Sequence, residues 1–500
     1  MIRKDFYLLG ILWLCVLFIF LPLFYSDYIF MDEALQIWGY NSIPGLHMFI
    51  DDGRWLTEKL QSWLFKMGDT IHDVTYVRLI SLFGWLLCLP IWYIVIKKIV
   101  AKVPAYEYLP FFICLYLVTS LPFIVSVQWA TCMQFFIADT AALLSGAVIL
   151  HGIRFNENKL RIPAMVIIPA LLLGVASLFL YQGAFACFLI PFLINFINPF
   201  KYKHDKVLIA GLAVYFFVYF FYFILYKLSF SLLNDISPAP RNALYIHPWE
   251  KIKFFLARPL ERSFRFTLLT NEDSIISKVY YPLMLVSLGV LAFKRFGIVK
   301  WRNAVKYLAG IGCIWLVSYI PPLLIQESFA SNRTLMALNM CVFIVCLEMA
   351  IYFIKSKRFL QIAGVGVLLF FVFCARYNFQ QVFLHPVQQE TAALKNYMKQ
   401  HYHNGITTIH FIRPSEDFMA EKYQVNRSMD ELGVGSSCWE WVPVSLTKQL
   451  VYEVTGDRKQ AAQLVVKHWA GKDAYLRSGE VITNTTLLVD VPVIMNSVKP

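Results

Sequence analysis

Repeated apolar runs, most of them near 20 residues long, constrain this chain more than any other feature. A run of that length crosses the hydrocarbon core of a bilayer as a helix. Charged residues make up only 15% of the 500 residues, against about 25% in ordinary soluble domains. The runs therefore predict an all-α polytopic membrane protein. Eleven spans are expected, at residues 7–25, 75–96, 108–127, 135–152, 163–181, 184–199, 207–226, 279–293, 307–325, 335–354 and 359–375.

The distribution of Lys and Arg predicts how these spans are oriented, because basic loops stay on the cytoplasmic side. One set of connecting segments carries nineteen basic and four acidic residues, whereas the short opposite loops carry almost none. We therefore expect a cytoplasmic N-terminus and an external C-terminus. The formal charge of +13 is then mainly a topology signal and does not indicate a nucleic-acid partner.

Three long segments fall on the external side: residues 26–74, 227–278 and 376–500. The first two are loops of a membrane domain at 1–375. The third is polar and nearly charge-balanced. It mixes strand-like runs (406–412 and 485–494) with a helix-like run at 387–402. We expect 376–500 to form a small extracytoplasmic α/β domain, which is long enough to fold alone.

The first external loop is rich in acids, and its pattern predicts two short amphipathic helices on the outer membrane surface. Asp32 and Glu33 follow the first span within ten residues. Asp51 and Asp52 precede Gly53, where one of them is expected to cap the second helix. The acids either face water in a loop that only covers the bundle, or they belong to a site.

The second external loop is basic. Arg258, Arg262 and Arg265 are spaced i, i+4, i+7, which predicts one helix face, and Arg241 lies upstream. Pro248 is expected at the first position of that helix and Pro259 to break or kink it. The arginines either bind anionic lipid headgroups or form a cradle for a phosphate or pyrophosphate group.

Carboxylates and guanidinium groups at one membrane surface fit transfer of a sugar from a polyprenyl phosphate. The acceptor hydroxyl needs a carboxylate to take its proton or align it. The leaving phosphate is already a good anion and needs cations. The carboxylates could also hold a divalent cation, which such donors do not demand. No Cys or His cluster predicts a zinc or redox site.

Several short motifs resemble the GT-C glycosyltransferase superfamily, and most closely its phage-type, serotype-converting O-antigen glucosyltransferases. The first external loop carries an acidic pair (Asp32-Glu33), then Gly39-Tyr40, then Gly53-Arg54 in "DDGRWL". A Tyr-Gln patch, "LFLYQGAF" at 178–185, and an Arg-bearing loop, "ASNRTLMAL" at 330–338, are similar to those of the family. The family often has two aspartates where this chain has Asp32-Glu33, and residues 376–500 match no part of it.

The resemblance implies an inverting hexosyltransferase of the bacterial inner membrane. The donor would be a sugar, glucose above all, on undecaprenyl phosphate, and the acceptor an O-antigen or related lipid-linked glycan on the periplasmic face. Asp32 would be the base, with Glu33 second. The implied donor-phosphate ligands are Arg54, Arg241 and Arg333, backed by Arg258, Arg262 and Arg265. The candidate sugar or acceptor contacts are Asp51, Asp52, Tyr181, Gln182, Trp38 and Trp55. The aromatic residues among them are equally suited to interface anchoring.

Two carboxylates fall within predicted spans, where a charge is costly and indicates function by default. Asp139 is near the outer end of its span and could line the same pocket, with Arg78 as a possible partner. Glu348 lies deeper and is expected only to pair helices.

Two alternatives compete with a glycosyltransferase. An O-antigen polymerase or ligase also has many spans and large external loops, but relies on arginines and lacks a required acidic pair after the first span. A transporter or flippase tends to have two related halves with polar groups at mid-membrane. In this chain the polar groups concentrate in the outer loops, and no half-to-half repeat is visible.

Overall fold

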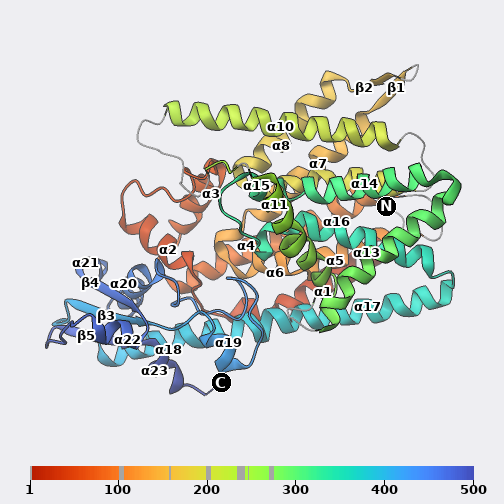
Figure 1. Cartoon of the computed structure of the whole chain (residues 1–500). Helices are drawn as coiled ribbons and strands as arrows, with labels where there is room; N and C mark the ends of the chain where they lie inside the picture. The colour runs from red at the N-terminus through yellow and green to blue at the C-terminus, as the bar shows by residue number, and fades with distance from the viewer. Residues whose placement is uncertain are drawn as a thin grey trace.

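A computed structural model describes residues 3–100, 106–156, 159–198, 204–232, 243–245, 247–269 and 275–499. The chain is mostly helical, at 74% helix, and includes a small β-sheet. Most long helices run side by side along one axis (Figure 1). A large apolar core fills the space between them, drawing on residues from Leu9 to Leu432.

Seven helical segments are long and apolar enough to cross a membrane, and the count rises to eight if one bent pair is a single span. The seven are Arg3–Tyr25, Ile71–Ile99, Ala130–Gly152, Asp205–Ser229, Lys278–Phe296, Met336–Phe353 and Arg358–His401. The helices that form the first six segments are α1 (Arg3–Phe20), η1 (Leu21–Tyr25), α4 (Ile71–Ile99), η3 (Ala130–Cys132), α7 (Phe135–Gly152), α10 (His204–Leu232), α13 (Ile275–Phe296) and α16 (Met336–Phe353). The bent pair is α5 (Leu109–Thr119) and α6 (Leu121–Gln128), with Pro122 at the start of α6.

The expected count of eleven spans is not confirmed. Three predicted spans correspond to shorter helices: α8 (Ala164–Leu180), the pair η4 (Gln182–Phe188) and α9 (Leu189–Ile197), and α14 (Trp301–Val317) with η7 (Ile298–Lys300) and α15 (Ile320–Leu324) around it. A hairpin of β1 (Arg154–Asn156) and β2 (Lys159–Arg161) joins α7 to α8. Apolar composition continues through these breaks, so the hydropathy pattern alone reads them as full spans.

The segment at 26–74, predicted to be the first external loop, forms the two short helices that its pattern predicts, α2 (Asp32–Ser42) and α3 (Trp55–Phe65). The next helix, α4, begins at a capping box, in which the Thr70 hydroxyl and the Asp73 carboxylate bond each other's backbone N–H. The expected Asp cap on α3 is wrong. The N-cap residue of α3 is Arg54, and no side chain caps the helix. Asp51 and Asp52 lie before Gly53, which has a φ of 75°, so neither aspartate occupies the capping position.

The described part of the second predicted external loop contains α11 (Pro248–Phe255), η6 (Leu256–Leu260) and α12 (Glu261–Phe266). Pro248 occupies the first turn of α11, as predicted. Pro259 lies in η6, a single π-helical turn, because proline cannot donate the hydrogen bond that would continue an α-helix. This turn separates Arg258 from the other two arginines of the predicted stripe.

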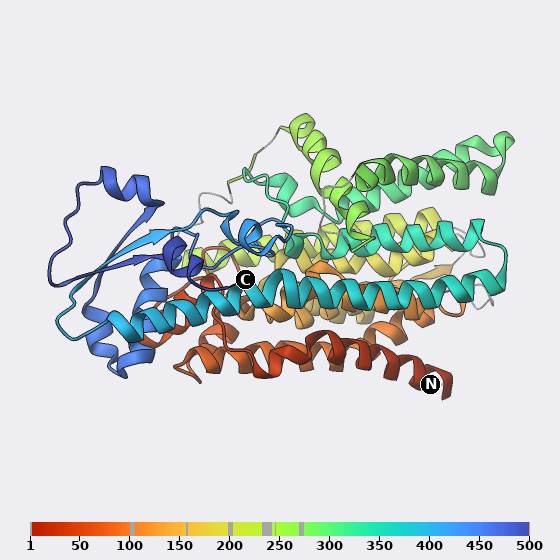
Figure 2. The ribbon, with the colours of Figure 1, turned by 90° about the horizontal axis from the view of Figure 1, so that it is seen from below.

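The last long helix runs the length of the bundle (Figure 2) and consists of α17 (Lys357–Tyr377), a π-helical turn η9 (Asn378–Leu384) and α18 (His385–His401). Residue 376, the predicted start of a separate domain, lies inside it. A three-stranded parallel sheet follows, in the order β4 (Val465–Ala470), β3 (Thr408–Arg413), β5 (Thr486–Asp490). Its helices are α19 (Phe418–Tyr423), α20 (Val442–Thr455), α21 (Arg458–Gln463), α22 (Lys472–Arg477) and α23 (Val491–Asn496).

A second apolar core joins this sheet region to the first external loop. Ile37 and Trp38 of α2 and Phe65 of α3 share it with Phe411 of β3 and Leu446 of α20. Helices α2 and α3 and the sheet lie at one end of the bundle, and the N-terminus and the β1–β2 hairpin at the other (Figure 1). The segment after the first span and the C-terminal residues therefore share one apolar core.

Candidate functional site

The predicted acidic pair is split by the turn that starts α2. Glu33 is fully buried and forms an ion pair with Arg78 of α4, which is fully buried too. It also accepts hydrogen bonds from the backbone N–H groups of Phe30 (2.7 Å) and Ala130 (2.6 Å). Every direction around this carboxylate is occupied by the protein. Glu33 fastens α2 to α4 and has no access to a substrate.

Asp32 points the other way. It is half-buried, and its Oδ1 accepts a hydrogen bond of 2.8 Å from the indole N–H of Trp441. The preceding residue, Met31, has a φ of 47°, which non-glycine residues adopt at a cost in strain. The backbone N–H of Met31 donates to Ser436 at 2.7 Å and holds this turn. The C-terminal region thus fixes the direction in which Asp32 points.

Arg54 is held beside the Tyr-Gln patch that the sequence singles out. Its Nε donates to Oε1 of Gln182 at 2.9 Å, and its guanidinium lies 5.0 Å from the centre of the Tyr181 ring. The same Gln182 donates to the backbone carbonyl of Asp52 at 2.6 Å. The carboxylate of Asp52 is 4.0 Å from the Arg54 guanidinium. Four residues predicted separately therefore form one cluster.

Arg333 lies in η8 (Asn332–Thr334), directly before α16. It forms ion pairs with Asp430 (3.0 Å) and Glu431 (3.2 Å), and its guanidinium lies 4.8 Å from the centre of the Trp129 ring. Burial acts to lower the pKa of Arg333, but the two carboxylates outweigh it and raise that pKa above its ordinary value. Much of the charge of Arg333 is balanced inside the protein.

Glu431 anchors the loop that carries Arg333. Besides its ion pair, it accepts backbone hydrogen bonds from Asn332 (2.7 Å) and Arg333 (3.2 Å). Burial and the neighbouring Asp430 raise the pKa of Glu431, while Arg333 and these N–H groups favour its charged form. The C-terminal region therefore holds this loop as well as Asp32.

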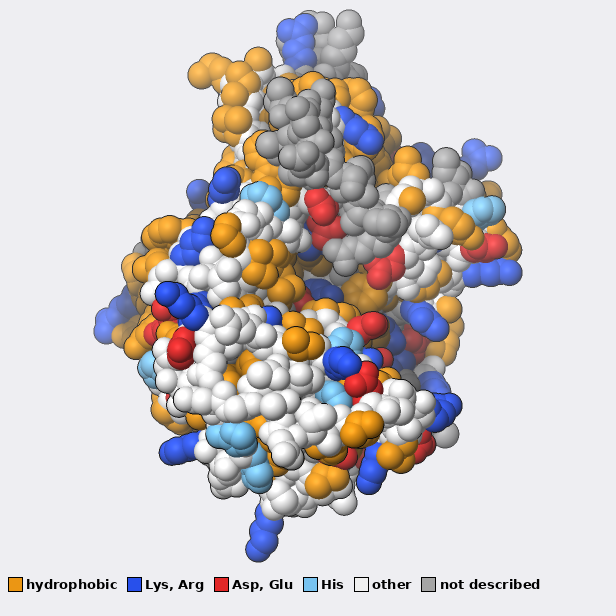
Figure 3. Space-filling model, turned by 90° about the vertical axis from the view of Figure 1, so that its left-hand side faces the viewer, with side chains coloured by type: hydrophobic (Ala, Val, Ile, Leu, Met, Phe, Trp, Pro, Cys, Tyr) orange, Lys and Arg blue, Asp and Glu red, His pale blue; other side chains and the backbone are white. Residues whose placement is uncertain are grey.

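These groups converge from segments far apart in the chain. Cys132 of η3 lies within electrostatic range of Asp32, Arg54, Arg333 and Glu431. Tyr181 lies within range of the same two arginines and of Glu431. Seen from this end, Lys, Arg, Asp and Glu side chains are scattered among apolar and other polar side chains (Figure 3). The elements that carry these groups pack together, α2 against η3 and η8 against η4.

The other arginines predicted to bind the donor phosphate lie farther from this cluster or pair elsewhere. Arg262 is nearest, because it donates to the backbone carbonyl of Ala330 at 2.7 Å, just before the Arg333 loop, and contacts the sulfur of Met429. Arg265 pairs with Glu261 of its own helix at 2.6 Å. Arg258 is exposed on η6. Arg241 lies outside the described residues.

Two tryptophans predicted to contact sugars have structural partners. Trp38 is 4% exposed, belongs to the core under α2 and is covered by the guanidinium of Arg458, 5.3 Å from the ring centre. Trp55 packs against Phe179, with ring centres 4.6 Å apart. Trp38 therefore has no face open for stacking on a sugar, and Phe179 covers one face of Trp55.

The predicted carboxylates beyond α2 are dispersed. Asp51 is exposed, and its backbone carbonyl accepts a hydrogen bond from Tyr226. Asp139 is buried in α7, within 3.5 Å of the Cys187 sulfur. The expected pairing of Asp139 with Arg78 is wrong, because Glu33 takes that guanidinium. Glu348 joins α16 to α13 through Arg295 (3.4 Å).

The described part of the chain contains no group of three His, Cys, Asp or Glu side chains placed to hold a metal ion. Sequence reasoning missed five residues of the cluster: Trp129, Cys132, Asp430, Glu431 and Trp441. Trp129 and Cys132 lie in a loop beside a predicted span, which was a usable signal. The other three belong to the polar C-terminal residues, where no spacing connects them to α2 or η8.

No model of a known family and no curated protein sequence matches this chain.

Proposed function

We propose that this chain is a membrane glycosyltransferase. It moves a hexose, in the first instance glucose, from an undecaprenyl-phosphate donor to an O-antigen or related lipid-linked glycan on the periplasmic face of the bacterial inner membrane. The observation that carries the proposal is that the segments bearing Asp32, Arg54 and Arg333 pack together. Helix α2 lies against η3, whose neighbour Trp129 is covered by Arg333, and η8 lies against η4, whose Gln182 holds Arg54. A site of this kind needs one base, cations for a phosphate, and a position beside the bilayer.

Asp32 is the general base of the proposed reaction. It accepts or aligns the proton of the acceptor hydroxyl, which then attacks the anomeric carbon of the donor sugar with inversion. The Trp441 indole orients this carboxylate through its 2.8 Å hydrogen bond. Of the predicted acidic pair, we propose only Asp32 as the base, because Glu33 forms a buried ion pair with Arg78.

Arg54 is the first donor-phosphate ligand. A guanidinium held at Nε by Gln182 still has its terminal N–H groups to offer to phosphate oxygens. Arg333 is the second ligand, although two carboxylates already compensate its charge. Arg333 would therefore bind the phosphate mainly through hydrogen-bond donors held in a fixed position, and less through net positive charge. The developing charge on the leaving phosphate would be stabilised without a general acid.

Transfer by the purified protein tests this proposal. The full chain in nanodiscs is mixed with polyprenyl-phosphate [¹⁴C]glucose and a lipid-linked O-antigen glycan, and labelled product is separated from donor. The proposal expects time-dependent label in the glycan and release of polyprenyl phosphate. Folded protein that transfers label from none of a panel of polyprenyl-phosphate hexoses would contradict it. Movement of an intact lipid-linked sugar across the bilayer of sealed proteoliposomes containing the same protein would favour a flippase instead.

A further inference from the structure

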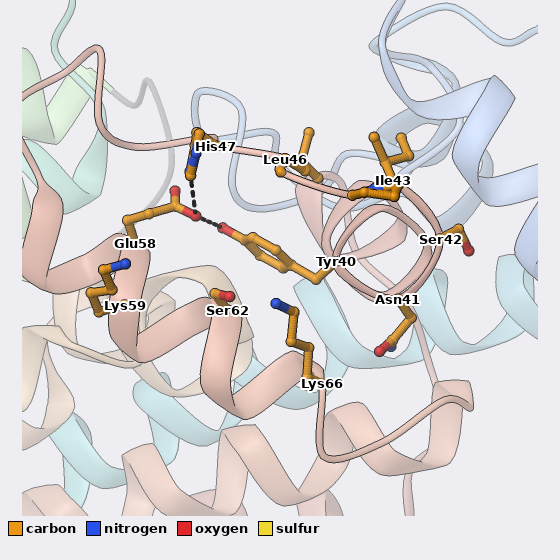
Figure 4. A pocket seen from close by; sticks show the side chains of 12 residues that line it. Tyr40, Asn41, Ser42, Ile43, Leu46, His47, Glu58, Lys59, Ser62 and Lys66 are labelled. Atoms are coloured by element: carbon orange, nitrogen blue, oxygen red, sulfur yellow. Dashed lines mark hydrogen bonds and ion pairs between the residues drawn. The ribbon is translucent and has the colours of Figure 1, made fainter. Parts of the chain in front are cut away.

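A polar cavity of about 360 Å³ opens between α2 and α3, away from the charged cluster (Figure 4). Its walls come from the last turn of α2, the connecting loop at 43–47 and one face of α3. A volume in this range suits a small ligand. The proposed reaction does not use it.

The cavity is preformed by hydrogen bonds between its walls. The amide of Asn41, at the end of α2, donates to the backbone carbonyls of Phe65 (2.9 Å) and Gly68 (3.0 Å) beyond α3. The hydroxyl of Tyr40 donates to Glu58 of α3 at 3.1 Å. These bonds fix the spacing of the two helices, so ligand binding would cost little free energy for ordering the site.

The side chains that line the cavity carry a net positive charge. Its one carboxylate, Glu58, is 2% exposed and accepts backbone hydrogen bonds from Met48 (2.8 Å) and Phe49 (3.0 Å) besides that of Tyr40. His47 also faces it at 3.9 Å. Internal donors thus surround this carboxylate, and it has little capacity left to hold the lysines that line the same cavity.

Those lysines are placed for an anion. Lys59, Ser62 and Lys66 are spaced i, i+3, i+7, which puts them on the face of α3 that lines the cavity. Within the part of the chain that the structure describes, neither lysine ammonium group forms an ion pair or hydrogen bond. The Lys66 amine and the Ser62 hydroxyl both extend beside the Tyr40 ring (Figure 4). Two free ammonium groups next to hydroxyl and amide groups match a ligand with both an anionic group and hydroxyls.

We propose that this cavity binds an acidic sugar unit of the acceptor glycan, one that carries a carboxylate or phosphate. The proposal rests on the proposed function, which it deepens by naming the acceptor class. Tyr40 is eight residues from Asp32 on the same helix, which places the cavity about 12 Å along α2 from the base. An acidic unit held there would leave neighbouring sugars of the glycan to reach Asp32.

Binding without catalysis tests the inference separately from the transfer reaction. The probes are a hexuronic-acid–hexose disaccharide and the same disaccharide with its carboxyl group reduced, each titrated calorimetrically into the full chain in nanodiscs of neutral lipid. We expect at least about a tenfold preference for the acidic probe, weakening with salt. The Lys59→Gln/Lys66→Gln variant should lose that preference. Lys399→Gln/Lys472→Gln, which removes two exposed lysines of the C-terminal region, should keep it.

The outcomes separate this inference from the proposed function. Asp32→Asn should retain the preference, since the base is not in the cavity. If wild-type protein transfers sugar but binds both probes equally, the inference is overturned and the proposed function stands. If the preference is present but no donor supports transfer, the cavity still binds acidic sugars and the proposed function fails. Loss of acidic-probe binding when phosphatidylglycerol replaces neutral lipid would mark a lipid headgroup site and overturn the inference.

Discussion

Glu33 of α2 and Arg78 of α4 form an ion pair in which both side chains are fully buried. Removing one partner of such a pair leaves an uncompensated charge, which costs about 3–5 kcal/mol. We predict that Glu33→Gln lowers the unfolding free energy by about this amount, measured by thermal or denaturant unfolding in detergent. Replacing both partners with apolar residues, as in Glu33→Leu/Arg78→Met, should recover part of the loss. A Glu33→Gln variant as stable as wild type would contradict this role.

The hydrogen bond from Trp441 to Asp32 predicts a positioning role for a residue of the C-terminal region. Trp441→Phe keeps an aromatic ring and removes the donor. Because a hydrogen bond to a charged group contributes about 1.5–3 kcal/mol, kcat should fall roughly 10- to 100-fold, with a smaller change in KM. Steady-state transfer kinetics measure this split.

A neighbouring indole supplies the control. Trp439 stacks on Trp441 with ring centres 5.3 Å apart, and within the described chain its N–H has no hydrogen-bond partner. Trp439→Phe should therefore leave kcat within about twofold of wild type. Equal losses in the two variants would mean that the aromatic packing, and not the bond to Asp32, is what matters.

Alanine substitutions of Arg54 and Arg258 are predicted to have very different effects on kcat/KM, although both arginines were candidates for binding the donor phosphate. Arg54→Ala should reduce kcat/KM for the polyprenyl-phosphate donor at least about tenfold, and Arg54→Lys should restore it only in part, because an ammonium cannot replace a planar fork. Arg258 is exposed on η6, so Arg258→Ala should change kcat/KM less than about twofold. Donor titrations check both. Comparable losses at the two positions would place the phosphate elsewhere.

The orientation inferred from Lys and Arg predicts which exposed positions face the periplasm. Val481, in the C-terminal region, and Val299, at η7, are both largely exposed. In spheroplasts, a membrane-impermeant maleimide should label Val481→Cys. It should label Val299→Cys only after the membrane is permeabilised. The reverse pattern would invert the topology and move the proposed site to the cytoplasm.

Local patterns in the sequence predicted local structure well. The apolar period of α2 and α3 and the position of Pro248 each specified a helix within a few residues. Strand β4 was missed because half of its residues are exposed and Lys467 and His468 interrupt its apolar residues. The short helices α8 and α14 were predicted to be full spans because a hydropathy pattern does not show where a helix ends.

The site could be predicted only in part, because its geometry depends on contacts between distant segments. Asp32 and Arg54 were found through charge in one loop. That Glu33 turns inward depends on Arg78, 45 residues away, and that Asp32 turns towards Trp441 on a contact across 409 residues. No periodicity or spacing encodes such pairings. The C-terminal region therefore had no assigned role from sequence, although it supplies Trp441 and Glu431 to the cluster.

The most direct test of the account is the transfer rate of Asp32→Asn in single-turnover conditions with bound polyprenyl-phosphate glucose and saturating acceptor. This change keeps the size of the side chain and an oxygen for the Trp441 bond, but removes the base. The account predicts a rate roughly 10²- to 10⁴-fold below wild type, with unfolding temperature and donor affinity unchanged. A variant that transfers sugar at the wild-type rate would contradict the assignment of Asp32 and favour a polymerase or ligase that depends on arginines alone.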